Sequence, residues 1–171
     1  MTGQEQTILS MLSYETPIKE KRKALNQAAE MADIAFLIRP AAFWRSWDYC
    51  AAVLLFIEDE KLAPYLPDLL QWVEALNDPG SAYVELRLEA MDPTVLVPAL
   101  NAFILQHRDA DSGDWYYGIS GLAYGVCHTR LTKEAIGILD KKRIERAGKV
   151  IHAGKAGLLG DCRDGEILAV E

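Results

Sequence analysis

Apolar residues recur along this chain at the three- and four-residue spacing of helices, and no segment shows the two-residue alternation of a half-buried strand. The clearest case follows Trp47, where Cys50, Val53, Leu54 and Ile57 fall on one helical face. The pattern therefore predicts an all-α protein.

Proline and turn-forming residues mark where further helices begin. Thr16-Pro17 and Asp92-Pro93 each combine a capping residue with proline, which is favoured at the first helical position. A helix is expected from Pro17 to about Met31. The apolar faces expected after residue 60 are Leu62, Leu66, Leu69, Leu70 and Val73; Val84, Leu88 and Met91; Leu96, Leu100, Phe103 and Ile104; Trp115, Ile119, Leu122 and Val126; and Ile136, Leu139 and Ile144.

These helical segments repeat with a period of 34 residues. The shift places leucines and a proline of residues 62–70 on residues 96–104, the turn 78–80 on 112–114, and Tyr83 on Tyr117. A looser third copy begins near Leu131. Helix pairs of this length stack into α-solenoids, because one pair alone cannot bury its apolar face. We therefore expect a HEAT-like stack of antiparallel helix pairs, although coincidence of leucines is the alternative.

A chain of 171 residues is most simply one domain. Within it, residues 1–46 are expected to form N-terminal helices that pack on the repeats, and residues 47–146 the helix pairs. Residues 147–171 are expected to be a helix end and tail, since the segment 148–157 is rich in glycine.

The net charge of −7 and the pI near 5.0 disfavour phosphate backbones and anionic membranes as partners and favour a basic protein. Solubility alone is the simpler explanation of this acidity. The longest apolar run, residues 51–57, is too short to span a bilayer. No export signal is evident at the N-terminus, so the cytoplasm is the default location.

The cysteines and histidines do not have the spacing of a disulfide framework, a zinc site or a Cys/His catalytic pair, and we expect no metal or cofactor. Cys50 and Cys127 lie in apolar surroundings typical of buried thiols, whereas the position of Cys162 is left open. The Gly154-Lys155 segment resembles the end of a P-loop but lacks its spacing, its hydroxyl residue and its preceding strand.

Three glycines, Gly118, Gly121 and Gly125, fall inside a predicted helix, where each costs roughly 1 kcal/mol relative to alanine. Close approach of a neighbouring helix is the main explanation. A ligand seated against bare backbone is the alternative.

Aromatic residues are the best candidates for partner binding, because tryptophan and tyrosine are enriched at interface hot spots. They gather near predicted helix starts and the helix ends that adjoin turns, where a solenoid exposes one edge of its stack. Core packing is nevertheless the commoner role of any single tryptophan. The candidates are Trp44, Trp47, Trp72, Trp115, Tyr116 and Tyr117.

The run LLQWVEALNDPG, residues 69–80, resembles the signature LLxWLxDxNWPG of a small, largely uncharacterised bacterial domain of HEAT-like helical repeats. The helix beginning at Trp47, the Pro64-Tyr65-Leu66 segment and Asp114-Trp115 are similar to other elements of that domain. Asp78 replaces its tryptophan and Ala75 an acidic residue, and the likeness covers about residues 47–125. It implies an α-solenoid-like fold without implying catalytic residues.

Two kinds of function are compatible with these features. A non-catalytic protein-interaction module, such as an immunity or adaptor protein that binds a basic partner, is favoured by the acidity, the repeat and the aromatic residues. The alternative is an enzyme, of hydrolase or base-excision type, with paired carboxylates on the concave face. Self-association through the apolar edges of terminal helices is a third possibility.

Overall fold

The computed structural model describes residues 1–74, 77–111 and 113–160, and within these ranges the regular structure is helical, without a strand. The all-α prediction is confirmed. In chain order the elements are α1 (Gly3–Met11), α2 (Ile18–Glu30), the short 3-10 helices η1 (Ala35–Leu37) and η2 (Ala41–Ser46), α3 (Trp47–Leu54), α4 (Asp59–Leu62), η3 (Ala63–Tyr65), α5 (Leu66–Glu74), α6 (Ser81–Glu89), α7 (Pro93–Gln106), α8 (Asp114–Leu122), the π-helical η4 (Ala123–Cys127), η5 (His128–Arg130) and α9 (Lys133–Gly160).

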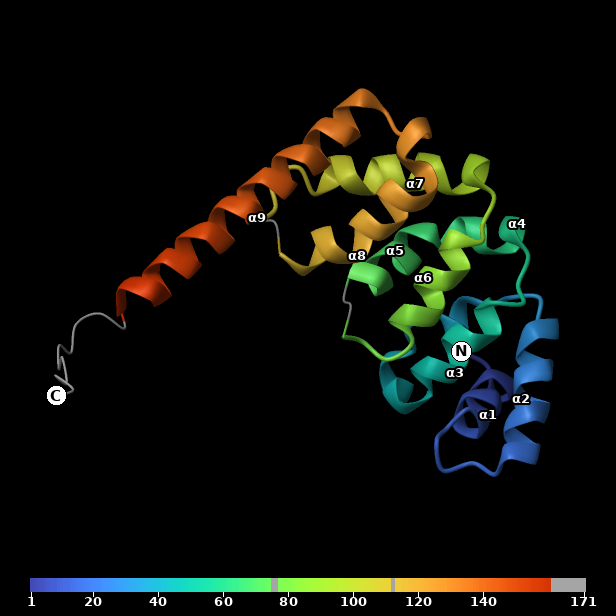
Figure 1. Ribbon diagram of the computed structural model, residues 1–171. Coiled ribbons are helices and arrows are strands. Elements are labelled where there is room, and N and C mark those ends of the chain that lie inside the picture. The colour runs from blue at the N-terminus through green and yellow to red at the C-terminus, as the bar shows by residue number, and fades with distance from the viewer. Residues whose placement is uncertain (75–76, 112, 161–171) are drawn as a thin grey trace, which may run out of the picture.

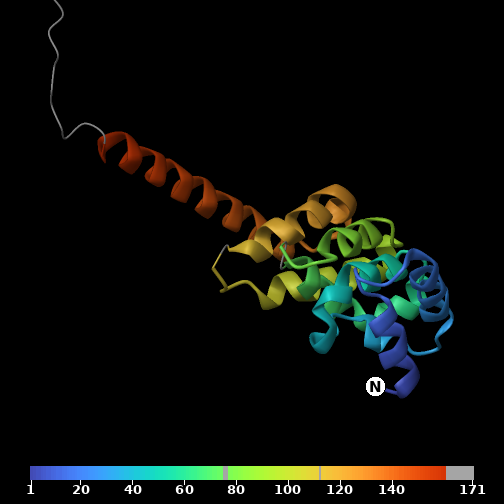
Figure 2. The same ribbon diagram turned by 90° about the horizontal axis from the view of Figure 1, so that it is seen from below.

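The helices follow one another along the molecule from α1 and α2 at one end to α9 at the other (Figures 1 and 2). Two series of contacts join alternate helices: α3 packs on α6 and α6 on α8, while α5 packs on α7 and α7 on α9. Helix α5 also contacts α6 and α8, which joins the two series. The outer half of α9 projects away from the other helices in both views.

One hydrophobic core runs through this arrangement and contains nearly all of the apolar positions that the helical periodicity selected. Trp72, at the centre of α5, is fully buried. Ile144 is an exception: it was expected to face the core, but it is 69% exposed because it lies on the side of α9 that faces solvent.

Local capping chemistry sets some helix boundaries as expected and others differently. Asp92 caps α7, accepting a hydrogen bond from the Thr94 amide at 2.8 Å, and Pro93 occupies the first helical position. Helix α2 instead begins at Ile18 after Pro17, without a side-chain cap from Thr16. At the other end of the chain, α9 continues to Gly160, so the glycine-rich segment 148–157 does not end the helix as predicted.

Gly118 permits the close approach of α8 to α5. A Cβ atom added to Gly118 would lie 2.2 Å from the carbonyl oxygen of Val73, which no side chain could tolerate without moving a helix. At Gly121 a Cβ would meet the Glu85 carboxylate at 3.1 Å, whereas nothing lies within 4 Å at Gly125. Close helix approach is therefore confirmed for Gly118, and does not explain Gly125.

In the part of the chain that the structure describes, no helix combines the length and apolar character needed to cross a membrane.

Candidate functional site

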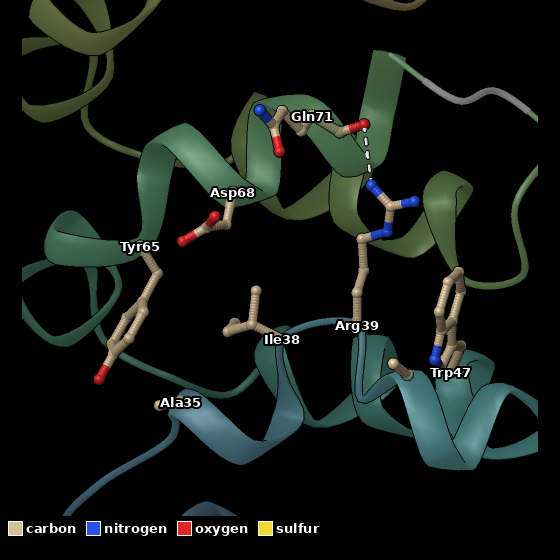
Figure 3. Close-up of a pocket in the computed structure, with 8 residues that line it drawn as sticks. Ala35, Ile38, Arg39, Trp47, Tyr65, Asp68 and Gln71 are labelled. Atoms are coloured by element: carbon tan, nitrogen blue, oxygen red, sulfur yellow. Dashed lines mark hydrogen bonds between the residues drawn. The ribbon is translucent and has the colours of Figure 1, made fainter.

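A cavity of about 480 Å³, open to solvent, lies between the segment 35–47 and one face of α5 (Figure 3). We call it the 35–71 cleft. Its lining combines a small apolar floor with aromatic and charged side chains, a composition typical of recognition sites. The lining residues are Ala35, Ile38, Arg39, Ala41, Trp47, Tyr65, Asp68 and Gln71.

Helical spacing places one wall of the 35–71 cleft. Tyr65 is the last residue of η3, and Asp68 and Gln71 follow on α5 at three-residue intervals. This spacing places the three side chains on one side of the continuous helical segment. Leu66, Leu69 and their neighbours occupy the opposite, buried face. The polar side of an amphipathic helix thus becomes the wall of the cleft.

Arg39 lies between this wall and the turn after α5. Its guanidinium donates a hydrogen bond to the Asp78 carboxylate at 2.7 Å, approaches the Gln71 carbonyl oxygen at 3.5 Å and lies 5.2 Å from the centre of the Trp47 ring. Arg39 has a φ of 45°, a left-handed conformation that costs a residue with a side chain on the order of 1 to 3 kcal/mol. The ion pair and the ring contact hold the residue in this conformation.

Trp47 forms the wall beside Arg39 and is itself firmly positioned. Its indole N–H donates to the Pro40 carbonyl at 3.0 Å, and its ring meets Trp72 edge-on with centroids 5.8 Å apart. Gly80, with a φ of 83°, packs beneath: a Cβ there would lie 2.8 Å from both the Ala51 Cβ and the Trp47 carbonyl oxygen. Because only glycine fits at this position, the turn can pack directly against the Trp47 backbone.

Carboxylates dominate the other end of the 35–71 cleft. Asp33, next to the cleft, accepts hydrogen bonds from the Ala35 amide at 2.9 Å and the Tyr65 hydroxyl at 3.1 Å, and these two bonds lower its pKa. Asp68 is exposed, and no hydrogen bond or ion pair joins its carboxylate to another described residue. This end of the cleft therefore offers negative charge to a ligand.

The six aromatic residues that the sequence suggested for partner binding fall into two groups, three in the core and three at the surface. Trp72, Trp115 and Tyr116 lie in the core, where they cannot touch a partner. Trp72 lies well inside α5, and Trp115 and Tyr116 lie in the first turn of α8. Backbone carbonyls satisfy the two indoles: Trp72 donates to Pro79 and Trp115 to Asp111.

The other three nominated aromatics reach the surface at different places. Trp47 lines the 35–71 cleft, Trp44 stacks near Arg45, and Tyr117 lies under the Arg146 guanidinium at 3.6 Å. They do not form one aromatic edge. Their part in partner binding stays a prediction, and Trp47 alone of the six lines the cleft.

Sequence reasoning missed five residues of this site: Asp33, Arg39, Tyr65, Asp68 and Gln71. The three-residue spacing on α5 was visible as the polar complement of its apolar face. Nothing in the sequence indicated that the segment 33–41 would fold across that face, because its conformation is set by contacts with residues more than thirty positions away.

The thiols are unsuited to nucleophilic chemistry. Burial raises the pKa of Cys50 to about 12 and also raises that of Cys127, so neither is readily ionised. Both are buried, as predicted, and Cys162 lies outside the described residues. Within those residues, no group of three or more histidine, cysteine or acidic side chains is arranged to hold a metal ion.

Comparisons of the chain with known protein families, with curated proteins and with solved structures found no match. The candidate site consequently rests on its own geometry.

Proposed function

We propose that this chain is a non-catalytic protein-interaction module, an adaptor or immunity protein, whose 35–71 cleft binds a basic side chain of a protein partner. One observation carries the proposal. The Asp68 carboxylate has no partner among the described residues, and it borders an open cavity lined by the rings of Tyr65 and Trp47.

A lysine or arginine side chain suits the chemistry of this cavity. Its aliphatic stem would lie over Ile38 and its cationic head beside Asp68 and the ring of Tyr65, an arrangement that combines apolar burial, ion pairing and cation–π attraction. Arg39, the cation already present, is neutralised by Asp78 and lies toward the Trp47 end. The net charge of −7 would draw basic partners from a distance.

The helical arrangement supports a repeat scaffold for this cleft. The two contact series, α3–α6–α8 and α5–α7–α9, are what stacked helix pairs would produce. Several long-range hydrogen bonds also join residues 30 to 32 positions apart, close to the 34-residue sequence period. They link Lys61 with Met31, Arg87 with Ile57, Thr132 with Asn101, and Lys142 with Ala110.

An enzyme would need a different carboxylate arrangement. Acid–base catalysis by two carboxyl groups requires one of them to keep its proton near neutral pH. Asp33 has a lowered pKa and is therefore ionised. Glu85, whose pKa burial and Glu89 raise, lies on α6 and does not line the 35–71 cleft.

Fluorescence anisotropy with labelled hexapeptides tests the proposal. The full chain is titrated with three peptides of otherwise identical sequence that carry lysine, arginine or glutamate at a central position. We expect the lysine and arginine peptides to bind and the glutamate peptide to bind up to about fivefold more weakly, as one partly exposed ion pair contributes up to about 1 kcal/mol and glutamate would lose it.

Asp68→Asn is the variant that assigns this selectivity to the cleft. Asp109→Asn is its matched control, since Asp109 is exposed but is not among the residues that line the cleft. Asp68→Asn should abolish most of the preference for the basic peptides, and Asp109→Asn should retain it. Equal binding of all three peptides, or equal loss in both variants, would contradict the proposal.

A further inference from the structure

A second hollow, of about 420 Å³, lies between α2 and α3, and we call it the α2/α3 groove. Its lining is largely apolar: Leu25, Asn26, Ala29, Ala52, Val53 and Phe56. Phe56 is 81% exposed, the highest exposed fraction among the large hydrophobic residues that the structure describes. A prominent ring therefore stands beside a largely apolar hollow on the same surface, and an exposed apolar patch of this kind is a candidate for an interaction site.

The groove runs along α2 because α2 and α3 lie side by side in the same direction. At one end the Lys21 ammonium donates to the Tyr49 hydroxyl at 2.7 Å. At the other end Ala29 and Phe56 both line an adjoining hollow. The start of α2 therefore lies at one end of the groove, and the end of α2 lies at the other.

Charge changes sign from one end of the groove to the other. Lys19, Arg22 and Lys23 are exposed in the first part of α2, where Glu20 is the one acidic residue, and Glu30 is exposed at its end. Glu58 and Lys61 lie at the same end of the groove as Glu30. The Lys61 ammonium donates a hydrogen bond to the Met31 carbonyl.

This order of charges does not stabilise α2 itself. The helix dipole favours acidic residues in the first turn and basic residues in the last, and α2 has no basic residue in its last turn. Arg22 and Glu30 also share the helical face of Leu25, Asn26 and Ala29, so both border the groove. A role in binding explains what helix stability does not.

We infer that the α2/α3 groove binds the same groove of a second copy of this chain, with the two α2 helices antiparallel. A two-fold interface must be self-complementary. Here the Phe56 ring of each copy would enter the hollow of the other, and the basic start of each α2 would face the acidic end of its partner. This inference is independent of the proposed function, because no residue lines both the groove and the 35–71 cleft.

Sedimentation velocity of the full chain at several concentrations tests the inference. The chain should show a monomer–dimer equilibrium, and Phe56→Asp should raise the dimer dissociation constant at least about tenfold, as expected for a central aromatic anchor. Ile144→Asp is the matched control, an apolar position on α9 that is also largely exposed, at 69%. It should leave the equilibrium unchanged, and circular dichroism should show both variants folded.

A charge exchange identifies the second copy as the occupant. Arg22→Glu and Glu30→Arg should each weaken the dimer severalfold, since each places like charges opposite one another in an antiparallel pair. The double variant should recover it, because glutamate at 22 then faces arginine at 30 of the partner subunit.

Three results would overturn the inference. They are a monomer at every concentration, a dimer that Phe56→Asp leaves intact or that Ile144→Asp dissociates, and a double charge variant that is weaker than either single one.

Discussion

Two arginine–aspartate pairs join distant parts of this chain, and their surroundings differ. Arg87, whose side chain is 8% exposed, donates to the carbonyls of Leu54 and Ile57 and pairs with Asp59. The Arg39 side chain is 32% exposed, pairs with Asp78 and borders the 35–71 cleft.

The difference separates a structural contact from a recognition surface. Arg87 donates to two carbonyls in the interior, where an unpaired group is costly, and pairs with the partly buried Asp59 carboxylate. Arg39 has a strained backbone, and its partly exposed side chain lines the cavity. Packing of the hydrophobic core requires neither feature. We therefore assign the Arg87 pair to stability and the Arg39 pair to the shape and charge of the 35–71 cleft.

The largest contrast should come from replacing each arginine by methionine. Arg87→Met leaves two buried carbonyls without their donor and Asp59 without its cation, and should lower the free energy of unfolding by about 3 kcal/mol or more. Arg39→Met should cost less than about 1 kcal/mol, because its pair is partly exposed. Urea unfolding measures both, and equal losses would remove the distinction.

Gly80 packs against Trp47, beside the Arg39–Asp78 pair, and its replacement should have the next largest effect on stability. Gly80→Ala places a Cβ against Ala51 and Trp47 at a positive φ, and should destabilise the fold by about 2 to 4 kcal/mol. Gly113 has only a carbonyl oxygen at 3.9 Å. Gly113→Ala is therefore the control, with an expected change below about 1 kcal/mol; a similar loss in both would show that the Gly80 turn is not tightly packed.

The turn at Gly80 also shows how far the sequence could predict this molecule. Helix positions and buried faces followed from periodicity, and the glycine–proline chemistry of residues 77–80 correctly indicated a joint between helices. The cleft did not follow, because Arg39 meets Asp78 only after helices far apart in sequence have packed. Trp72 and Trp115 could serve either binding or core packing on the sequence alone, and the structure buries both. Composition does not tell which of these roles an aromatic residue takes.

Acid should weaken the buried pair selectively. Burial raises the pKa of Asp59, but hydrogen bonds from the Asp92 amide and Arg87 outweigh burial and hold the pKa below its ordinary 3.8. The stability it contributes is therefore present above pH 3.8 and lost as the pH falls through the lower folded-state pKa.

Asp59→Asn isolates this contribution. The variant should be less stable than the parent chain by about 2 kcal/mol at neutral pH, and the difference should shrink below pH 3.8. Urea unfolding at pH 7 and pH 3 provides the comparison. A difference that stays constant between the two would exclude ionised Asp59 as its source.

The smallest expected change in stability comes from the Arg39–Asp78 pair. Asp78→Asn should alter the free energy of unfolding by less than about 1 kcal/mol. It leaves the Arg39 charge uncompensated in the cleft, so the lysine hexapeptide should bind about two- to fivefold more weakly. Anisotropy measures the affinity, and unchanged binding would place the peptide away from Arg39.

The central claim, that the 35–71 cleft receives a basic side chain, is tested most directly by NMR. ¹H–¹⁵N spectra of the full chain are recorded during titration with the lysine hexapeptide. The account predicts chemical-shift changes concentrated in residues 33–41 and 65–71 and in the Trp47 indole N–H. Changes centred on the α2/α3 groove or on α9, or changes of equal size with the glutamate peptide, would contradict it.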